Sequence, residues 1–541
     1  MKKKLLAVFL AAAMISCFAA GCGGKKEDPA ETKAPETTAE TKAPAAGNPV
    51  EGGTLTVRVS ADPLNINPLY VTDLNSFTIM QSLYAPFFEI VGGEVYYGNG
   101  LLQEVTANED STVFTMKLKE GLTWHDGEAI TADDIVFSME TLVDESQAVP
   151  YSTYGFDGGG NVAVTEKVDD LTATITFKSS STGFLGSLSQ IYCIPKHIYE
   201  GVQKIGESEL NYEPVGSGPF KFVSYQSGQE YVVERFDDYK CGDNAAHLDK
   251  VVFKIVKDTN SAIAALQSGD LNALTINSDD YKTVDGMSNV TINHYNSGQV
   301  NAMGMNTLKD GLSDQKVRQA ISLAMNKEEL VTFSYTSTEF ATPAYSILTP
   351  DTLYYSEPET KYDNDQEQAK KLLKEAGAEG LNLSLLYSTA DPAMEKEALY
   401  IQSKLGEVGI TVTLDPQEDS VFKNTLQEPN STAYDLVLEN WELGAEPSLY
   451  ADIIKTGTRS NNSNVSDADL DALWDQGLKT PNGEERAQIY TDIQNMVNDK
   501  MYIYTISYSN GFYALSNNFG GFDDFLLQTI YLDYSKLYAV E

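Results

Sequence analysis

The side chains that most often carry metal or nucleotide chemistry are few in this sequence and lie far apart. The chain contains four histidines, His125, His197, His247 and His294. No two of them have the spacing of a zinc-binding pair, and no Cys-x-x-Cys motif accompanies them. Neither a Walker loop nor a dinucleotide-binding glycine fingerprint occurs. We therefore expect no metal or cofactor site, and any energy source for the protein's work lies in another subunit.

Two further features resemble catalytic motifs, but a structural role explains each of them better. Ser217 stands between two glycines and directly before Pro219, which indicates a tight turn and lacks the Gly-x-Ser-x-Gly pattern of a nucleophile elbow. Asp133 and Asp134 begin a predicted helix, where the helix dipole stabilises carboxylates. We therefore do not expect an enzyme.

The charge balance excludes a nucleic-acid partner. The 541 residues include 38 Lys and Arg against 78 Asp and Glu, which gives a formal net charge of −40. The strongest basic cluster, Lys2-Lys3-Lys4, lies in a predicted leader, so nothing basic remains to replace phosphate counterions. The acidity fits either a solubilising role at a cell surface or an acidic proteome, and it identifies no ligand. The length predicts two or three packed units.

The N-terminus has the pattern of a bacterial lipoprotein. The basic cluster precedes an apolar run over residues 5–20, which ends in Ala19-Ala20-Gly21-Cys22. This predicts a signal peptide over 1–21 and a lipid-modified Cys22 that anchors the protein to the outer side of the cell membrane. Ordinary signal-peptidase cleavage at an Ala-x-Ala-like site is the alternative.

The segment after Cys22 is predicted to be a disordered tether over residues 22–50. Residues 23–49 contain no aromatic side chain, and the sequence ETKAP at 31–35 recurs at 40–44. Such a stretch cannot bury enough apolar surface to fold. As a flexible chain it has an end-to-end distance of about 30 Å.

The rest of the chain mixes strand and helix patterns. Leu55, Val57 and Val59 alternate with polar residues, as in a half-buried strand. Further strands are predicted at 113–118, 173–177, 231–236 and 251–256. Helices are predicted at 132–142, 260–266, 316–325, 365–376, 395–408 and 484–497. This mixture favours an α/β or α+β body. Cys193 and Cys241 are the cysteines of this body, and the sequence leaves open whether they pair.

One long motif and four shorter ones resemble a known family. Residues 114–138 read FTMKLKEGLTWHDGEAITADDIVFS, which predicts a strand, a tight turn at His125-Asp126-Gly127 and a helix capped near Thr131. The matches LNINP (64–68), PVGSGPF (214–220), VRQAI (317–321) and LLKEAG (372–377) follow in the family's order. The chain from residue 52 onward thus resembles family 5 of the bacterial extracellular solute-binding proteins, which serve peptide and nickel ABC importers.

This resemblance implies a two-lobed α/β fold of the periplasmic-binding-protein type, class II, with an extra α+β domain on the first lobe. We expect the first lobe to comprise residues 51–82, 191–300 and 500–541, the extra domain residues 83–190, and the second lobe residues 301–499. Proteins of this type close like a hinge around the ligand.

The resemblance also implies a site in which main-chain groups hold a peptide. The loop after the early proline motif corresponds to Thr72-Asp73-Leu74, and a second segment runs from Trp441 to Pro447. Peptide-binding relatives place an Asp three residues after this Trp, where it pairs with the ligand's ammonium group, whereas this chain has Gly444. Glu442 or Glu446 could supply the charge. Alternatively, the amino end is held differently, or the ligand is not a free peptide.

The candidate ligand-binding residues are therefore Thr72, Asp73, Leu74, Trp441, Glu442, Leu443, Gly444, Glu446 and Tyr508. Tyr508 is our choice from a tyrosine-rich C-terminal run. Core packing is the alternative for Trp441, a solvated loop acid for Asp73, and an ordinary strand residue for the tyrosines.

We predict a monomeric substrate-binding lipoprotein that captures di- or oligopeptides and delivers them to the permease and ATPase subunits of an ABC importer. Binding of a nickel chelate or a sugar, or sensing of peptides without import, are alternatives. A surface hydrolase would need a catalytic constellation that we do not find.

Overall fold

The computed structural model describes residues 49–541 apart from 92–93, 157–159, 243–245, 336, 338, 429, 523–525 and 529–530. The described residues belong to one compact unit. Cys22, the predicted leader and most of the predicted tether lie outside the described residues, so the lipid anchor stays a prediction. No helix in the described part is both long and apolar enough to cross a membrane.

One large mixed sheet runs through this unit. Its strands, in order across the sheet, are β16 (Thr411–Gln417), β15 (Asn382–Ser388), β17 (Leu436–Trp441), β13 (Val290–Met305), β18 (Ile503–Ser516), β12 (Ala273–Ile276), β2 (Thr54–Val59), β11 (Lys250–Ile255), β10 (Glu230–Arg235) and β9 (Phe220–Gln226). A short strand, β14 (Ala341–Pro343), also pairs with β18. We call the β9 side of the β13–β18 pair the first lobe and the β16 side the second lobe.

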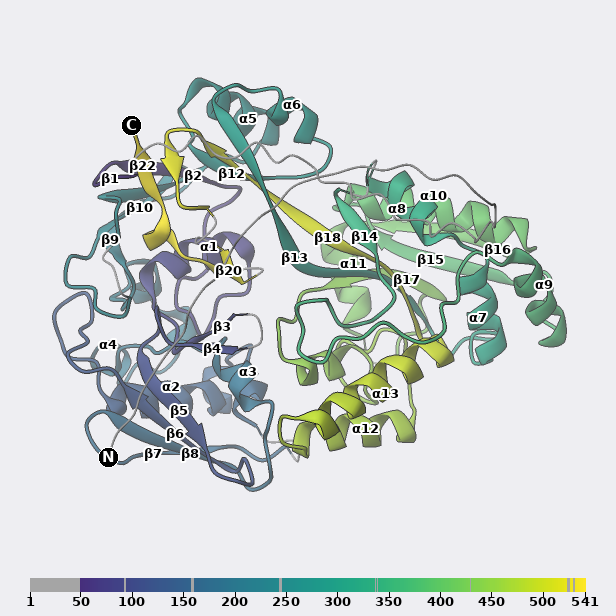
Figure 1. Ribbon diagram of the computed structural model, residues 1–541, viewed down its shortest axis with the longest axis horizontal. Helices are drawn as coiled ribbons and strands as arrows, with labels where there is room; N and C mark the ends of the chain where they lie inside the picture. The colour runs from purple at the N-terminus through teal and green to yellow at the C-terminus, as the bar shows by residue number, and fades with distance from the viewer. Residues whose placement is uncertain are drawn as a thin grey trace, which may run out of the picture. The chain divides into compact units, whose positions relative to one another are not determined.

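The long strands β13 and β18 connect the two lobes, and they lie side by side in Figure 1. Their antiparallel register shifts between Asn296 and Val300 and again between Asn301 and Ala302. Such irregularities bend a strand and increase its twist. The sheet therefore changes direction where one lobe gives way to the other.

The helices divide between the lobes. The first lobe carries α1 (Leu74–Leu83), α2 (Ala132–Val143), α3 (Phe184–Leu188), α4 (Lys196–Tyr199), α5 (Thr259–Ser268) and α6 (Tyr281–Asp285). The second carries α7 (Gln315–Leu323), α8 (Lys327–Tyr335), α9 (Gln366–Glu375), α10 (Pro392–Glu407), α11 (Asp419–Leu426), α12 (Ala468–Lys479) and α13 (Glu484–Lys500). Gly377 and Gly409 follow α9 and α10 with φ of 65° and 89°, the left-handed conformation that ends helices.

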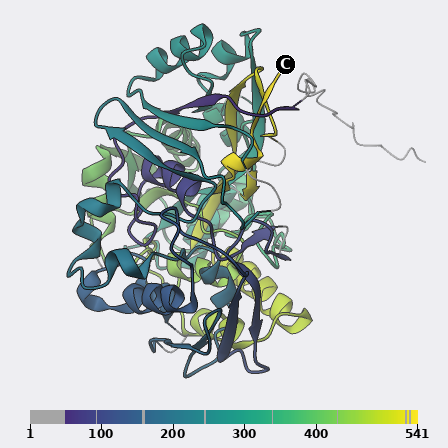
Figure 2. The ribbon, with the colours of Figure 1, turned by 90° about the vertical axis from the view of Figure 1, so that its left-hand side faces the viewer.

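A separate four-stranded sheet lies in the region predicted as an extra domain. Its order is β5 (Leu102–Ala107), β6 (Val113–Leu118), β8 (Thr172–Thr176) and β7 (Val164–Lys167). Helix α2 packs against β7 and β8, as the dark blue elements in Figures 1 and 2 show. The buried side chains of this sheet are continuous with the core of the first lobe. The predicted domain boundaries themselves stay predictions.

The long sequence motif ties this sheet to the glycine-rich turn. His125 accepts a hydrogen bond from the Gly216 amide at Nδ1 (3.1 Å), and its Nε2 lies 3.1 Å from the Gly218 carbonyl oxygen. Burial lowers the pKa of His125 to about 4, so the ring is neutral. The Ser217 hydroxyl accepts from the Ala85 amide at 3.1 Å. A Cβ on Gly216 would lie 2.0 Å from the Leu83 carbonyl oxygen. In this structure the motif therefore packs the four-stranded sheet against the glycine-rich turn.

The end of the chain returns to the first lobe. Tyr534 and Leu537 are fully buried in its core. The small pairings are β1 (Pro49–Val50) with β22 (Tyr538–Val540) and β19 (Phe519–Gly520), β3 (Glu89–Val91) with β4 (Glu94–Tyr96), and β20 (Leu526–Gln528) with β21 (Tyr531–Leu532). Cys193 and Cys241 are both free and buried.

Candidate ligand-binding site

A cleft of about 760 Å³ separates residues 150–187 of the first lobe from residues 423–478 of the second. Sites for small molecules and cofactors are typically about 300–1,000 Å³ in volume. Leu443, one of the predicted ligand-binding residues, lines this cleft. The cleft therefore places part of the predicted site at a boundary between the lobes.

The loop at Thr72-Asp73-Leu74 adjoins the cleft through Tyr151. The Tyr151 hydroxyl donates a hydrogen bond to the Val71 carbonyl at 2.7 Å, and the Tyr151 side chain lines the cleft. Thr72 and Leu74 are exposed. Asp73 caps helix α1, because its carboxylate accepts from the Ser76 amide at 3.0 Å and from the Ser76 hydroxyl at 2.5 Å. The carboxylate thus has a local structural task, while the residues on either side of it are exposed to solvent.

Trp441 and Tyr508 lie in one apolar cluster of the second lobe. The Trp441 indole donates to the Ile347 carbonyl at 3.3 Å, and the Tyr508 hydroxyl donates to the Ser346 carbonyl at 3.1 Å. Both residues are less than a tenth exposed: 7% for Trp441 and 6% for Tyr508. These side chains therefore fix the segment around residue 346 beneath the site, and their polar atoms already have partners.

Gly444 has a backbone reason for being glycine. Its φ is 78°, in the left-handed region that glycine adopts without strain. A Cβ there would lie 3.2 Å from Gln190 Nε2. The Gly444 carbonyl accepts from the Thr352 hydroxyl at 3.3 Å and from the Tyr450 hydroxyl at 3.2 Å. These bonds hold the segment after Trp441 in one conformation.

Glu446 forms a buried ion pair with Arg486. Its Oε1 lies 2.6 Å from Arg486 Nη2, and the Arg486 side chain is fully buried. The guanidinium also donates to the Gly477 carbonyl at 2.8 Å and to Asn482 Oδ1 at 2.6 Å. Burying a charge is costly unless it is paired and hydrogen-bonded. The Glu446 carboxylate is therefore engaged within the second lobe.

Glu442 is in the opposite situation. Within the described chain its carboxylate has no hydrogen bond or ion pair, although Tyr295 of β13 is close enough to feel its charge. The residue keeps solvent-exposed surface, yet the protein atoms around its carboxylate raise the pKa to about 7 by desolvation. Because water still reaches the side chain, the free-energy cost is smaller than this shift alone implies. A ligand cation would relieve that cost.

Sequence reasoning missed the aromatic wall of the cleft. Tyr151 and Tyr154 stack with ring centroids 5.7 Å apart and an interplanar angle of 28°, and Phe156 and Phe184 also line the cleft. The two tyrosines are three positions apart, a spacing that is common in sequences and indicates no site. Only the packing of this loop against residues 71 and 190 turns them into a wall.

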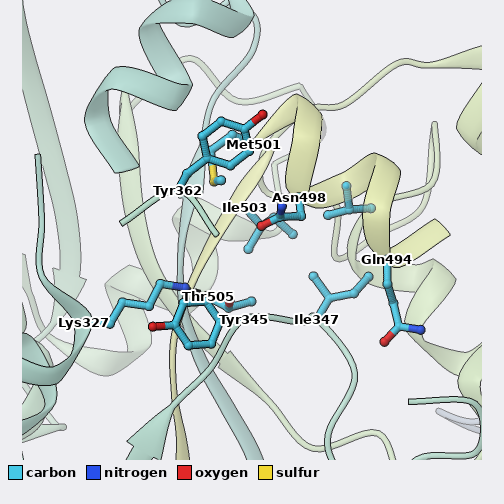
Figure 3. A pocket seen from close by; sticks show the side chains of 10 residues that line it. Lys327, Tyr345, Ile347, Tyr362, Gln494, Asn498, Met501, Ile503 and Thr505 are labelled. Carbon is cyan, nitrogen blue, oxygen red and sulfur yellow. Dashed lines mark hydrogen bonds between the residues drawn. The ribbon is translucent and has the colours of Figure 1, made fainter. Parts of the chain in front are cut away.

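A second cavity in the second lobe surrounds Lys327 and has a volume of about 10 Å³, room for at most one water molecule. Figure 3 shows Lys327 beside Tyr345 and Thr505. Lys327 Nζ donates to the Ala344 carbonyl at 2.5 Å and lies 4.5 Å from the centroid of the Tyr504 ring. Burial lowers the pKa of Lys327 to about 7. The cavity is too small for a solute, so Lys327 is part of the lobe's interior.

Metal ligands do not converge anywhere in the described part of the chain, where no group of three or more His, Cys, Asp or Glu side chains could hold an ion. Two lobes joined by paired strands, with a cleft between them, define the class of protein: a solute-binding receptor of the periplasmic-binding-protein type.

The model of the bacterial extracellular solute-binding proteins, family 5 (Middle), matches residues 97–462. The chain belongs to this family. The ABC transporter substrate-binding protein CtaP of Listeria monocytogenes has a similar solved structure, with 37% sequence identity, a TM-score of 0.86, and coverage of 91% of this chain and 100% of that chain.

A curated relative is the oligopeptide-binding protein AppA of Bacillus subtilis (strain 168), which is 27% identical over 96% of this chain and 97% of its own length. Its structure in complex with a nonapeptide has a TM-score of 0.74 and 25% identity, covering 91% of this chain and 100% of that chain. These similarities confirm the predicted family and the two-lobed fold.

Proposed function

We propose that this protein is the substrate-binding component of an ABC importer and that its ligand is a peptide. The cleft between the lobes, lined by Leu443 of the segment that follows Trp441, carries this proposal. Family membership and the peptide named for a relative's complex support it. The protein binds and releases its ligand unchanged, and the permease and ATPase subunits complete the transport.

Main-chain groups recognise the peptide, which lets one site accept many sequences. The exposed backbone at Thr72–Leu74 faces one side of the ligand, and the hydrogen-bonded segment around Gly444 faces the other. Glu442 takes the ligand's ammonium group in place of the Asp found in relatives. Glu446 does not take this role, because Arg486 holds its carboxylate at 2.6 Å.

The lobes close around the ligand by bending at the irregular part of β13 and β18. Contacts between the lobes lie at the edge of the cleft: the Thr182 amide donates to the Leu478 carbonyl at 3.1 Å, and the Ser180 hydroxyl donates to the Lys479 carbonyl at 3.3 Å. Opening breaks these few bonds, which are easily replaced by water. A ligand that bridges both walls favours the closed state.

Lipid on Cys22 anchors the protein outside the cell membrane and keeps it near its permease. Changing Cys22 to Ala should release the protein from the membrane fraction into the soluble fraction. A protein that stays membrane-bound after this change would contradict lipid anchoring at Cys22.

Isothermal titration calorimetry with peptide pools of two to nine residues tests the ligand class. We expect heat with peptides and a smaller radius of gyration in small-angle X-ray scattering when they bind. A sugar or a metal chelate that binds while every peptide pool gives no heat would overturn the assignment.

A further inference from the structure

The two walls of the cleft differ in chemistry. The first-lobe wall is aromatic, with Tyr151 and Tyr154 stacked on each other. The second-lobe wall is largely polar, and its charged members are Lys423, Asp452 and Arg459. A ligand between them therefore meets an apolar surface on one side and fixed charges on the other.

Two of these three charged residues already have partners. Lys423 lies 2.7 Å from Asp419 in an exposed ion pair one helical turn away. Asp452 accepts a hydrogen bond from the Ser460 hydroxyl at 2.6 Å. Arg459 is exposed and makes no hydrogen bond, ion pair or ring contact with any described residue. In a chain with a formal net charge of −40, an arginine that lines a cleft without an acidic partner stands out.

The backbone on both sides of Arg459 is well fixed. The Thr458 hydroxyl donates to the Lys455 carbonyl at 2.6 Å, and Asn461 Nδ2 donates to the Val465 carbonyl at 2.8 Å. Lys455 in turn pairs with Asp475. The turn that carries Arg459 is thus held in place while the guanidinium itself stays uncommitted. The planar guanidinium of an arginine can bind a carboxylate through two parallel hydrogen bonds, and that of Arg459 is free to do so.

We propose that Arg459 is the anion-binding residue of this cleft and that it binds a carboxylate of the ligand. The carboxylate is either the C-terminus of the peptide or an Asp or Glu side chain, and an adjacent apolar side chain packs on Tyr151 and Tyr154. Asp452, on the same wall, repels a carboxylate placed away from Arg459. This inference rests on the proposed peptide ligand.

The test combines variants of the full chain with matched peptides in calorimetry. One parent peptide has a free C-terminus and an internal Glu, the second is its C-terminal amide, and the third replaces the Glu with Gln. For the unmodified protein, we expect one of the two peptides that lack a carboxylate to bind about tenfold or more weakly than the parent peptide. The carboxylate missing from that peptide is the one that Arg459 binds. R459Q should abolish this difference, and R459K should retain part of it.

K374Q is the matched control, because Lys374 is an exposed cation on α9 of the same lobe that does not line the cleft. We expect this variant to show the same loss of affinity as the unmodified protein when the parent peptide is replaced by the peptide that lacks the carboxylate. An equal penalty in R459Q and the unmodified protein, or no penalty in the unmodified protein, would overturn the role of Arg459 while leaving peptide binding intact. Failure of every peptide to bind the unmodified protein would instead reject the proposed ligand class.

Discussion

Glu442 and Glu446 are equivalent candidates in the sequence but have different tasks in the structure, and neutralising each one separates these tasks. Glu446 faces the fully buried Arg486, whereas Glu442 has no partner among the described residues. We predict that E446Q lowers stability and leaves ligand preference unchanged. We predict that E442Q leaves stability unchanged and alters ligand preference.

The magnitude follows from the surroundings of Arg486. E446Q keeps an oxygen that can accept from Nη2, and the Gly477 carbonyl still accepts from Nε at 2.8 Å, but no negative charge remains beside the guanidinium. Breaking a buried ion pair by removing one partner costs about 3–5 kcal/mol. Since hydrogen bonding survives in part, we expect about 3 kcal/mol. E442Q removes no interaction within the described chain, so we expect no loss of stability.

Urea unfolding measures the stability of both variants, and calorimetry compares a free-amine peptide with its N-acetylated form. A hydrogen bond to a charged group contributes about 1.5–3 kcal/mol, so E442Q should reduce the preference for the free amine roughly 10- to 100-fold. Lowering the pH from 8 to 6 should also reduce the preference for the free amine, because the pKa of Glu442 is raised to about 7 and its carboxylate becomes protonated over this range. If E446Q lost the amine preference while keeping full stability, our assignment of the two carboxylates would be wrong.

Three further predictions concern buried charge and backbone strain. Burial lowers the pKa of Lys327 to about 7 in the folded state, whereas in the unfolded state this lysine stays protonated to about pH 10.4, so the free energy of unfolding should rise between these pH values. K327M should remove this rise of up to about 4 kcal/mol, measured by urea unfolding at a series of pH values. Burial raises the pKa of Glu397 to about 8, so the folded state holds a proton that the unfolded state loses above about pH 4.3, and the free energy of unfolding should fall as pH rises toward 8. E397Q should reduce this fall by up to about 4 kcal/mol in the same assay. G444D should lower the free energy of unfolding by about 1–2 kcal/mol, because the φ of 78° at Gly444 is strained for a residue with a Cβ, and it should strengthen the binding of free-amine peptides in calorimetry. An unchanged free energy of unfolding would contradict backbone strain at this position.

Local patterns predicted several of the individual elements, but not the long strands β13 and β18 that connect the lobes. Residues 113–118 alternate in burial as β6, and α2 begins after Thr131, whose amide donates to Asp134 Oδ2 at 2.9 Å. The helices predicted at 365–376 and 395–408 stop directly before Gly377 and Gly409, both of which adopt the left-handed conformation. The periodicity of buried residues and the capping groups are local properties, which a sequence displays directly.

The site was harder to predict because its residues meet only through the tertiary fold. The pairing of Glu446 with Arg486 spans 40 positions, and the wall formed by Tyr151 depends on a bond to Val71, 80 positions away. The family resemblance located the segment around Gly444, but it could not say which neighbouring carboxylate is free. That distinction depends on burial and on partners, which no local pattern contains.

The distribution of satisfied and unsatisfied charges argues for a ligand that carries both signs. Asp73, Glu446 and Lys423 are near the cleft, and each has a partner inside the protein. Glu442 and Arg459 have none within the described chain, although both lie on or beside the segments that line the cleft. The unpaired charge of Glu442 is partly desolvated, which costs free energy in the empty protein that a ligand cation recovers on binding. Arg459 is exposed, so a ligand anion can reach its guanidinium without displacing a protein partner. A peptide with a free ammonium group and a carboxylate satisfies both residues at once, whereas a neutral sugar satisfies neither.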